Sequence, residues 1–290
     1  MRIFVTGATG WVGSAVVQEL TNAGHEVSGL VRSEKDRARL VANGIDAVLG
    51  TLDNLDVLRQ AAINADAVIH TAFNHDFSKF AENCEQDRRA IEAIGNGLDG
   101  TKKPLLVTSG VALLASGRLA TEDDTPPDLP SYPRRSESAA RGLALRGINA
   151  ASVRLAPTVH GEGDHGFIRT LIALAKDKGV SAFIGDGMNR WPAVHRFDAA
   201  KLYRLALESG VTRSSYHAIA EEGIPFREIA GAIGRALGVP VESRAPEHFG
   251  WFAGFAGMDI ATSSRITREL LDWTPTHPGL MADLELNHYF

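Results

Sequence analysis

The segment Thr6-Gly7-Ala8-Thr9-Gly10-Trp11-Val12-Gly13 decides the fold expected of this 290-residue chain. It follows a short apolar run, residues 3–5, and opens a run with helical apolar spacing, residues 12–20. Glycines between a strand and a helix permit a tight turn, close approach of backbone to a pyrophosphate, and close helix–strand packing. The helix N-terminus offers N–H groups and a partial positive charge to phosphates. We therefore expect a dinucleotide site at Gly7, Thr9, Gly10, Trp11, Val12 and Gly13.

Short apolar runs alternate with helix-length segments through the first half of the chain. Alternation of strand and helix favours parallel pairing with right-handed crossovers. The predicted fold class is α/β, with a Rossmann-type doubly wound parallel sheet over residues 1–156. Helical patterns dominate the remainder, which predicts a smaller, mostly helical substrate lobe over residues 157–290, partly returning to the first domain around 194–221. The expected strands of the sheet are residues 3–5, 27–31, 46–49, 66–70, 104–108 and 151–155.

Composition excludes several classes of protein. Hydrophobic residues make up 44% and charged residues 22% of the chain, as in a folded globular protein. The net charge of −5 provides no basic excess for nucleic acid or an anionic membrane. The single cysteine, Cys84, rules out an internal disulfide and a cysteine-rich metal site. Since neither a spanning helix nor a signal peptide is evident, we expect a cytoplasmic protein with a small-molecule substrate.

The residues at the end of the second predicted strand bear on the choice of cofactor. An acidic residue at this point would accept a hydrogen bond from a ribose hydroxyl and select NAD. This chain instead has Arg32 and Ser33, with Lys35 and Arg37 close behind. A planar guanidinium suits a 2′-phosphate, and a serine hydroxyl can add a hydrogen bond. NADP(H) is therefore predicted over NAD, the alternative being that Arg32 is an ordinary solvated residue.

The order of the motifs resembles the short-chain dehydrogenase/reductase superfamily, in its extended and atypical branches of NAD-dependent epimerase/dehydratase-like proteins. After the glycine loop come the matching segments 50–53, 70–73, 107–110, 154–161 and 194–200. The resemblance implies a homodimer formed through helices that flank the sheet. It also implies further cofactor contacts from Thr51, Leu52, Thr71, Ala72, Phe73, Pro157 and Val159.

The catalytic pair implied by this resemblance is missing. The superfamily carries Tyr-x-x-x-Lys on the helix after the fifth strand, where the tyrosine passes a proton to the substrate oxygen. The lysine lowers the pKa of that tyrosine and holds the ribose. Pro133 and Glu137 occupy the two positions here, and Tyr132 lies one residue early. Either Arg134 or Arg135 can replace the charge of the lysine.

Three residues remain as catalytic candidates, namely Ser109, Tyr132 and His160. Ser109 can donate a hydrogen bond to a substrate oxygen, or it can satisfy backbone at the end of its strand. Tyr132 is an acid by type, but it can equally pack beside the following proline. His160 is a proton donor suited to neutral pH, in a glycine-rich loop where an exposed histidine is the alternative.

Residues of the second half provide candidates for substrate contact. His165 lies in the glycine-rich loop, and segment 185–195 mixes polar, aromatic and turn-forming residues. The flexible glycines make a poor ligand set, so no metal is expected. The aromatic segment 248–255 is expected to pack in a core, with a lid or a subunit interface as alternatives. The substrate candidates are His165, Asn189, Trp191 and His195, with packing as the equal alternative for Trp191.

Three functions are compatible with these features. The leading prediction is an NADP-dependent oxidoreductase that reduces a carbonyl on a small organic substrate by hydride transfer. The missing Tyr-x-x-x-Lys pair motivates a second, a non-catalytic NADP-binding protein that acts as a redox-responsive regulator. A third is a sugar-nucleotide epimerase or dehydratase-like enzyme, which rests on fold-level analogy.

Overall fold

The computed structural model describes residues 1–112, 114, 117–127, 133–286 and 289–290. The chain divides into two compact units. Unit 1 comprises Met1–Ser109, Pro127–Arg154 and Ala200–Tyr216. Unit 2 comprises Gly110–Pro126, Leu155–Ala199 and His217–Phe290.

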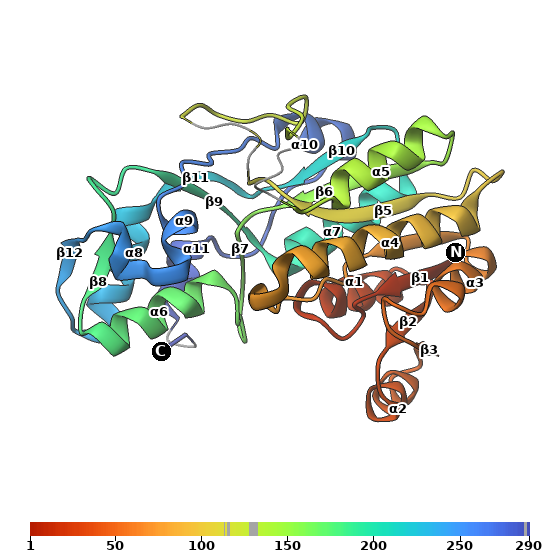
Figure 1. The fold of residues 1–290 in the computed structure, drawn as a ribbon, viewed down its shortest axis with the longest axis horizontal. Coiled ribbons are helices and arrows are strands. Elements are labelled where there is room, and N and C mark those ends of the chain that lie inside the picture. The colour runs from red at the N-terminus through yellow and green to blue at the C-terminus, as the bar shows by residue number, and fades with distance from the viewer. Residues whose placement is uncertain (113, 115–116, 128–132, 287–288) are drawn as a thin grey trace. The chain divides into compact units, whose positions relative to one another are not determined.

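The main sheet has seven strands in the order β10-β6-β5-β4-β1-β2-β3 (Figure 1). The pairs β1–β2, β2–β3, β1–β4 and β4–β5 are parallel. Because β2 and β4 lie on opposite sides of β1, the winding reverses there, and the doubly wound α/β prediction is confirmed. The strands are β1 (Arg2–Thr6), β2 (Glu26–Val31), β3 (Asp46–Leu49), β4 (Ala67–His70), β5 (Leu105–Gly110), β6 (Ala150–Leu155) and β10 (Ser215–Ala218).

Helices cover both faces of this sheet because the central strands are apolar on both sides. Phe4 and Val68 share a core with α3, α4 and α5, whereas Ile3 and Ile69 alternate to the opposite face and are equally buried. An ion pair of 2.7 Å joins Glu19 of α1 to Arg204 of α7. The helices are α1 (Trp11–Asn22), α2 (Glu34–Ala42), α3 (Leu55–Asn64), α4 (Phe80–Leu98), α5 (Ser136–Leu145) and α7 (Arg196–Glu208), with a short 3-10 turn η1 (Phe77–Lys79).

Unit 2 contains two small sheets that the sequence patterns did not fully predict. Strand β9 (Arg190–His195) lies between β11 (Glu221–Pro225) and β7 (Thr158–His160), and β8 (Ser181–Phe183) pairs with β12 (Val241–Ser243). Strands of three to six residues are too short to show a clear alternation. The helical elements are α6 (Phe167–Lys178), α8 (Phe226–Leu237), η2 (Pro246–Phe252), α9 (Ala253–Ala256), α10 (Arg265–Leu271) and α11 (Leu280–Glu285).

The core of unit 2 is aromatic. The ring of Trp191 lies 5.0 Å from that of Phe226 and 5.9 Å from that of Phe252, measured between centroids. Phe249 and Phe252 of the aromatic segment are buried in this core, whereas Trp251 is 60% exposed. Phe255 also packs against this core, so the packing expected of that segment is found for three of its phenylalanine rings. None of the described helices combines the length and the apolar character needed to cross a membrane.

Candidate functional site

The glycine loop between β1 and α1 has the geometry of a dinucleotide cradle. Gly7 adopts a φ of 70°, in the left-handed region that favours glycine, and the N–H of Gly10 donates to its carbonyl oxygen at 2.8 Å. A Cβ on Gly13 would lie 2.0 Å from that same oxygen. A Cβ on Gly7 would lie 2.8 Å from the backbone nitrogen of Ala72. No side chain fits at either position, so the backbone surface stays open.

The start of α1 is open to an anion. Its N-cap residue is Gly10, which makes no side-chain cap, and the first turn carries no acidic residue. The helix dipole and the N–H groups of the first turn therefore face the loop without a competing carboxylate. Thr9, Trp11 and Val12 line this turn and are all partly exposed. These features fit the pyrophosphate of a dinucleotide.

The two predicted cofactor residues that follow β2, Arg32 and Ser33, have different surroundings. Arg32 is exposed, and its guanidinium has no hydrogen-bond partner in the described part of the chain. Ser33 instead caps α2, because its hydroxyl accepts from the Asp36 N–H at 3.1 Å and donates to the Asp36 carboxylate at 2.8 Å. Ser33 thus has a structural use that the sequence analysis missed, although it lies beside Arg32.

The segment after β3 is a compact turn. The amide of Thr51 donates to Oδ1 of Asn54 at 2.8 Å, and the Thr51 hydroxyl accepts from the Asp53 N–H at 3.2 Å. Leu52 is partly buried against the core of unit 1. The predicted cofactor residues Thr51 and Leu52 therefore lie in unit 1, at the carboxyl end of β3.

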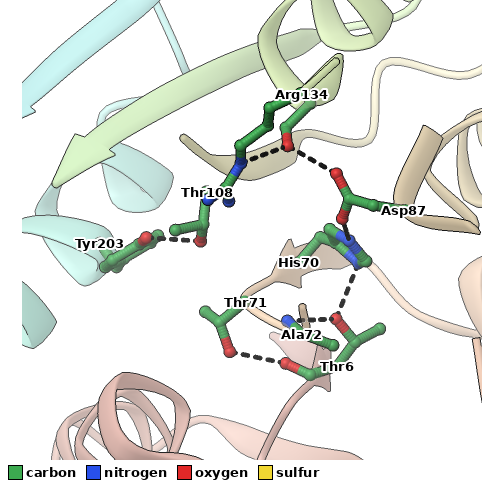
Figure 2. Close-up of polar contacts among 9 residues, drawn as sticks. Thr6, His70, Thr71, Ala72, Asp87, Thr108, Arg134 and Tyr203 are labelled. Carbon is green, nitrogen blue, oxygen red and sulfur yellow. Dashed lines mark hydrogen bonds and ion pairs between the residues drawn. The ribbon is translucent and has the colours of Figure 1, made fainter. Parts of the chain in front are cut away.

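The end of β4 is tied to the end of β1 by side-chain hydrogen bonds (Figure 2). The Thr71 hydroxyl donates to the Thr6 carbonyl at 2.7 Å, and the Ala72 N–H donates to Oγ1 of Thr6 at 3.3 Å. Oγ1 of Thr6 also lies 2.8 Å from Nδ1 of His70. The predicted cofactor residues Thr71 and Ala72 are thereby fixed beside the glycine loop.

A buried acid continues this network. Nε2 of His70 lies 2.9 Å from Oδ1 of Asp87 in α4, and the hydroxyl of Ser136 donates to Oδ2 at 2.5 Å. Because the carboxylate only accepts, Nε2–H is the donor and Nδ1 accepts from the threonine hydroxyl. The side chain of Arg134 donates from Nε to the Ser136 hydroxyl at 3.0 Å. Its guanidinium carbon lies 4.3 Å from the ring centroid of Phe73, the last of the predicted residues after β4.

The position of the family lysine is occupied by an acid with its own partner. Glu137 accepts from Nε of Arg154 at 2.9 Å and from Nη2 at 2.5 Å. The Arg154 side chain is 2% exposed and that of Glu137 is 11% exposed, so the arginine is buried and the acid partly buried. The Ser109 hydroxyl points to the same carboxylate at 3.5 Å. Tyr132, the other catalytic candidate of this region, lies outside the described residues.

His160 belongs to a buried cluster in unit 2. Its Nδ1 donates to Oδ2 of Asp283 at 2.8 Å, while its Nε2 is buried without a hydrogen-bond partner among the described residues. The hydroxyl of Tyr289 accepts from the Gly161 N–H at 3.1 Å and donates to Asp164 at 3.2 Å. Burial raises the pKa of both Tyr289 and Asp164. The His160 loop is thus held down by Asp283 and Tyr289, and the alternative of an exposed histidine does not apply to His160.

His195 lies in the same cluster. Its ring stacks on that of His277 at 4.6 Å, and the centroid of the His160 ring is 5.4 Å away. Burial, aided by these two histidines, lowers the pKa of His195 to about 4. The ring is therefore neutral at pH 7. Asp198 accepts from Nδ1 of His277 at 2.9 Å, which orients the outer ring of the stack.

The other substrate candidates differ in their surroundings. Trp191 is fully buried in the aromatic core, so the structure favours the packing alternative. The side-chain amide of Asn189, directly before β9, donates to the carbonyls of Ala256, the last residue of α9, and Met258 at 2.9 and 3.0 Å. His165 is exposed.

Two predicted cofactor residues lie in unit 2, next to the buried cluster. Pro157 directly precedes β7, and Val159 is the central residue of that strand; both are partly exposed. Across the described ranges, no group of three or more histidine, cysteine or acidic side chains is placed to hold a metal ion.

Asp87 is a residue of the site that the sequence analysis missed, although the pattern of its helix could have indicated it. It lies on the stripe of α4 that carries Cys84, Ala90 and Ile94, all of which are buried. A carboxylate within an apolar helical stripe needs a polar partner, which is a sign of a network. Asp283 and Tyr289 carried no comparable signal, since their partners lie more than 120 residues away.

The fold and the glycine cradle define a dinucleotide-binding protein of the Rossmann type. The profile of the NAD dependent epimerase/dehydratase family matches residues 3–219. The chain belongs to this family, as the motif resemblance predicted.

Two sequence relatives and one solved structure illustrate the family. An uncharacterized protein of Schizosaccharomyces pombe is 52% identical over 100% of both chains. A 2-alkyl-3-oxoalkanoate reductase of Stenotrophomonas maltophilia is 27% identical over 84% of this chain and 78% of its own. The UDP-glucose 4-epimerase of Thermus thermophilus, solved with NAD, superposes with a TM-score of 0.76 at 20% identity, covering 100% and 99% of the chains. The last likeness shows the fold.

Proposed function

We propose that this protein is an NADP(H)-dependent oxidoreductase that reduces a carbonyl group on a small organic substrate. The observation that carries the choice of NADP(H) is Arg32, which lies directly after β2 with an exposed guanidinium and no partner among the described residues. A cation at this point favours a 2′-phosphate, whereas an acid would favour the ribose hydroxyl of NAD. The relative from Stenotrophomonas maltophilia is named as a reductase of 3-oxo compounds, which supports the reaction class.

The proposed reaction assigns roles to the glycine loop, Arg32, Ser109 and Tyr132. The glycine loop and the N-terminus of α1 bind the pyrophosphate, and Arg32 binds the 2′-phosphate. The bound cofactor supplies the hydride. Ser109 turns from Glu137 to donate a hydrogen bond to the substrate oxygen, and Tyr132 is the proton donor of this proposal.

Calorimetric titration of cofactor-stripped protein with NADPH and NADH tests the choice of cofactor. We expect the protein to bind NADPH more tightly than NADH. Arg32→Ala should lower the affinity for NADPH by about tenfold or more and change the affinity for NADH little. Arg265→Ala is the matched control, because Arg265 is exposed on α10 in unit 2. Equal binding of both cofactors by the unaltered protein would contradict the role of Arg32.

One observation favours the non-catalytic alternative. The lysine position holds Glu137, and a negatively charged carboxylate does not lower the pKa of a neighbouring acid as a lysine ammonium does. Oxidation of NADPH in the presence of a panel of carbonyl compounds that includes 2-alkyl-3-oxoalkanoates separates the two functions. Turnover that is reduced in Ser109→Ala supports the reductase. Tight NADPH binding without turnover supports a redox-responsive regulator.

A further inference from the structure

The guanidinium of Arg134 is held by a hydrogen bond from Nε and by stacking on an aromatic ring. Its two terminal nitrogens make no hydrogen bond to the described residues. Nε donates to the Ser136 hydroxyl at 3.0 Å, and the guanidinium lies 4.3 Å from the ring centroid of Phe73. Nη1 and Nη2 have no hydrogen-bond partner within the described residues. Arg134 is only partly buried. An arginine held this way presents two N–H donors to a ligand in a fixed geometry. Its side chain is already ordered before the ligand binds, so binding costs less conformational entropy.

Hydrogen bonds connect Arg134 to Thr6, the residue before the glycine loop (Figure 2). The Ser136 hydroxyl donates to Asp87, which binds His70, which in turn contacts Thr6. All four of these side chains are buried. Thr6 directly precedes Gly7, so a continuous hydrogen-bonded chain couples the position of the guanidinium to the position of the cradle.

The strand order shows which half of a dinucleotide this fork would meet. In the sheet, β2 lies on one side of β1, and β4 and β5 lie on the other. A dinucleotide whose pyrophosphate sits at the β1–α1 loop extends along the carboxyl edge in both directions. Arg32 follows β2 and marks the side of the 2′-phosphate, which belongs to the adenosine half. Phe73 follows β4, so Arg134 lies on the side left for the nicotinamide half.

We propose that Arg134 binds the ribose of the nicotinamide half, donating from Nη1 and Nη2 to its neighbouring hydroxyl oxygens. This inference rests on the proposed NADP(H) function. Two adjacent hydroxyl oxygens match the spacing of a planar fork, and charge-assisted hydrogen bonds are stronger than neutral ones. Glu137, at the lysine position, carries no positive charge, and both of its carboxylate oxygens already accept from Arg154. Arg134 thus supplies, from another position, the cation that the missing lysine would have provided.

The test compares two ligands that share one half. NADPH has both halves, whereas adenosine 2′,5′-bisphosphate has the adenosine half alone. Calorimetric titrations of Arg134→Gln are expected to show NADPH affinity about ten- to a hundredfold lower and bisphosphate affinity unchanged. Arg134→Lys keeps the positive charge but not the planar pair of donors, and its NADPH affinity is expected to fall less than that of Arg134→Gln. Arg32→Ala is expected to weaken both ligands.

Arg135→Gln is the matched control, because it removes the adjacent guanidinium, and its affinities are expected to equal those of the unaltered protein. Thermal unfolding without ligand shows whether each variant is folded. NADPH affinity of Arg134→Gln within twofold of the unaltered protein would overturn the proposal, and so would an equal loss for both ligands. Failure of the unaltered protein to bind NADPH would instead overturn the proposed function itself.

Discussion

Nε2 of His70 lies 2.9 Å from the carboxylate of Asp87, and the two side chains are 1% and 2% exposed. The two residues come from β4 and α4, and the acid also accepts from Ser136 at the start of α5. A single buried carboxylate therefore joins β4, α4 and α5 of unit 1. Such a group stabilises the fold only while all its partners are present, because an unpaired polar group in a low-dielectric core is costly.

We expect Asp87→Ala to lower the free energy of unfolding by about 3–5 kcal/mol, because it leaves His70 and Ser136 buried without their acceptor. Urea denaturation measures the change. Glu82→Gln is the control on the same helix, since Glu82 is exposed, and we expect a change below about 0.5 kcal/mol. A small effect of Asp87→Ala would show that water can replace the carboxylate.

Gly13→Ala is expected to abolish dinucleotide binding. The added Cβ would lie 2.0 Å from the carbonyl oxygen of Gly7, so α1 must move away from the loop. Titration with NADPH measures the loss. Gly142→Ala in α5 is the control, because a Cβ there meets no atom within 4 Å. That variant should bind normally and be more stable by about 0.5–1 kcal/mol, since alanine favours a helix interior. Normal NADPH binding by Gly13→Ala would contradict the cradle.

Glu137→Gln is expected to destabilise unit 1 by about 3 kcal/mol, because it removes a negative charge that faces the buried guanidinium of Arg154. Urea denaturation compares it with Glu269→Gln, which breaks an ion pair between side chains that are 68% and 62% exposed. The exposed pair should contribute less than about 0.5 kcal/mol. Similar effects of the two substitutions would show that Arg154 finds another acceptor.

His195 gives a pH dependence of stability. Burial and the adjacent histidines lower its pKa to about 4 from an ordinary value of 6.5. Between these values the unfolded chain binds a proton that the folded chain does not. The contribution of His195 to the free energy of unfolding is therefore fully present above pH 6.5. It is lost as the pH falls toward 4, by about 3 kcal/mol in total.

Urea unfolding as a function of pH measures this contribution. His195→Gln should show a shallower decline between pH 6.5 and 4 than the unaltered protein, with parallel curves above pH 7 as the internal control. An unchanged decline in the variant would assign the pH dependence to other groups.

Local patterns in the sequence predicted six of the seven strands of the main sheet, but not β10. All six expected strands of the main sheet are present, and β1, Gly7 and α1 form the loop that the glycine spacing predicted. Strand alternation, turn chemistry and helix starts depend on residues a few positions apart, so they are readable without the fold. The same local reading identified Arg32 after β2 but missed the capping role of Ser33.

Only the tertiary structure decided which side chains meet at the site. Arg134 and Arg135 are indistinguishable in the sequence, and the choice between them comes from Ser136, Asp87 and Phe73. Ser136 and Asp87 are 49 positions apart, and His160 and Asp283 are 123 positions apart. Contacts between residues so far apart in sequence depend on strand order and helix packing, which no local pattern encodes. The chain itself determined that a dinucleotide cradle exists, and the fold determined which residues surround it.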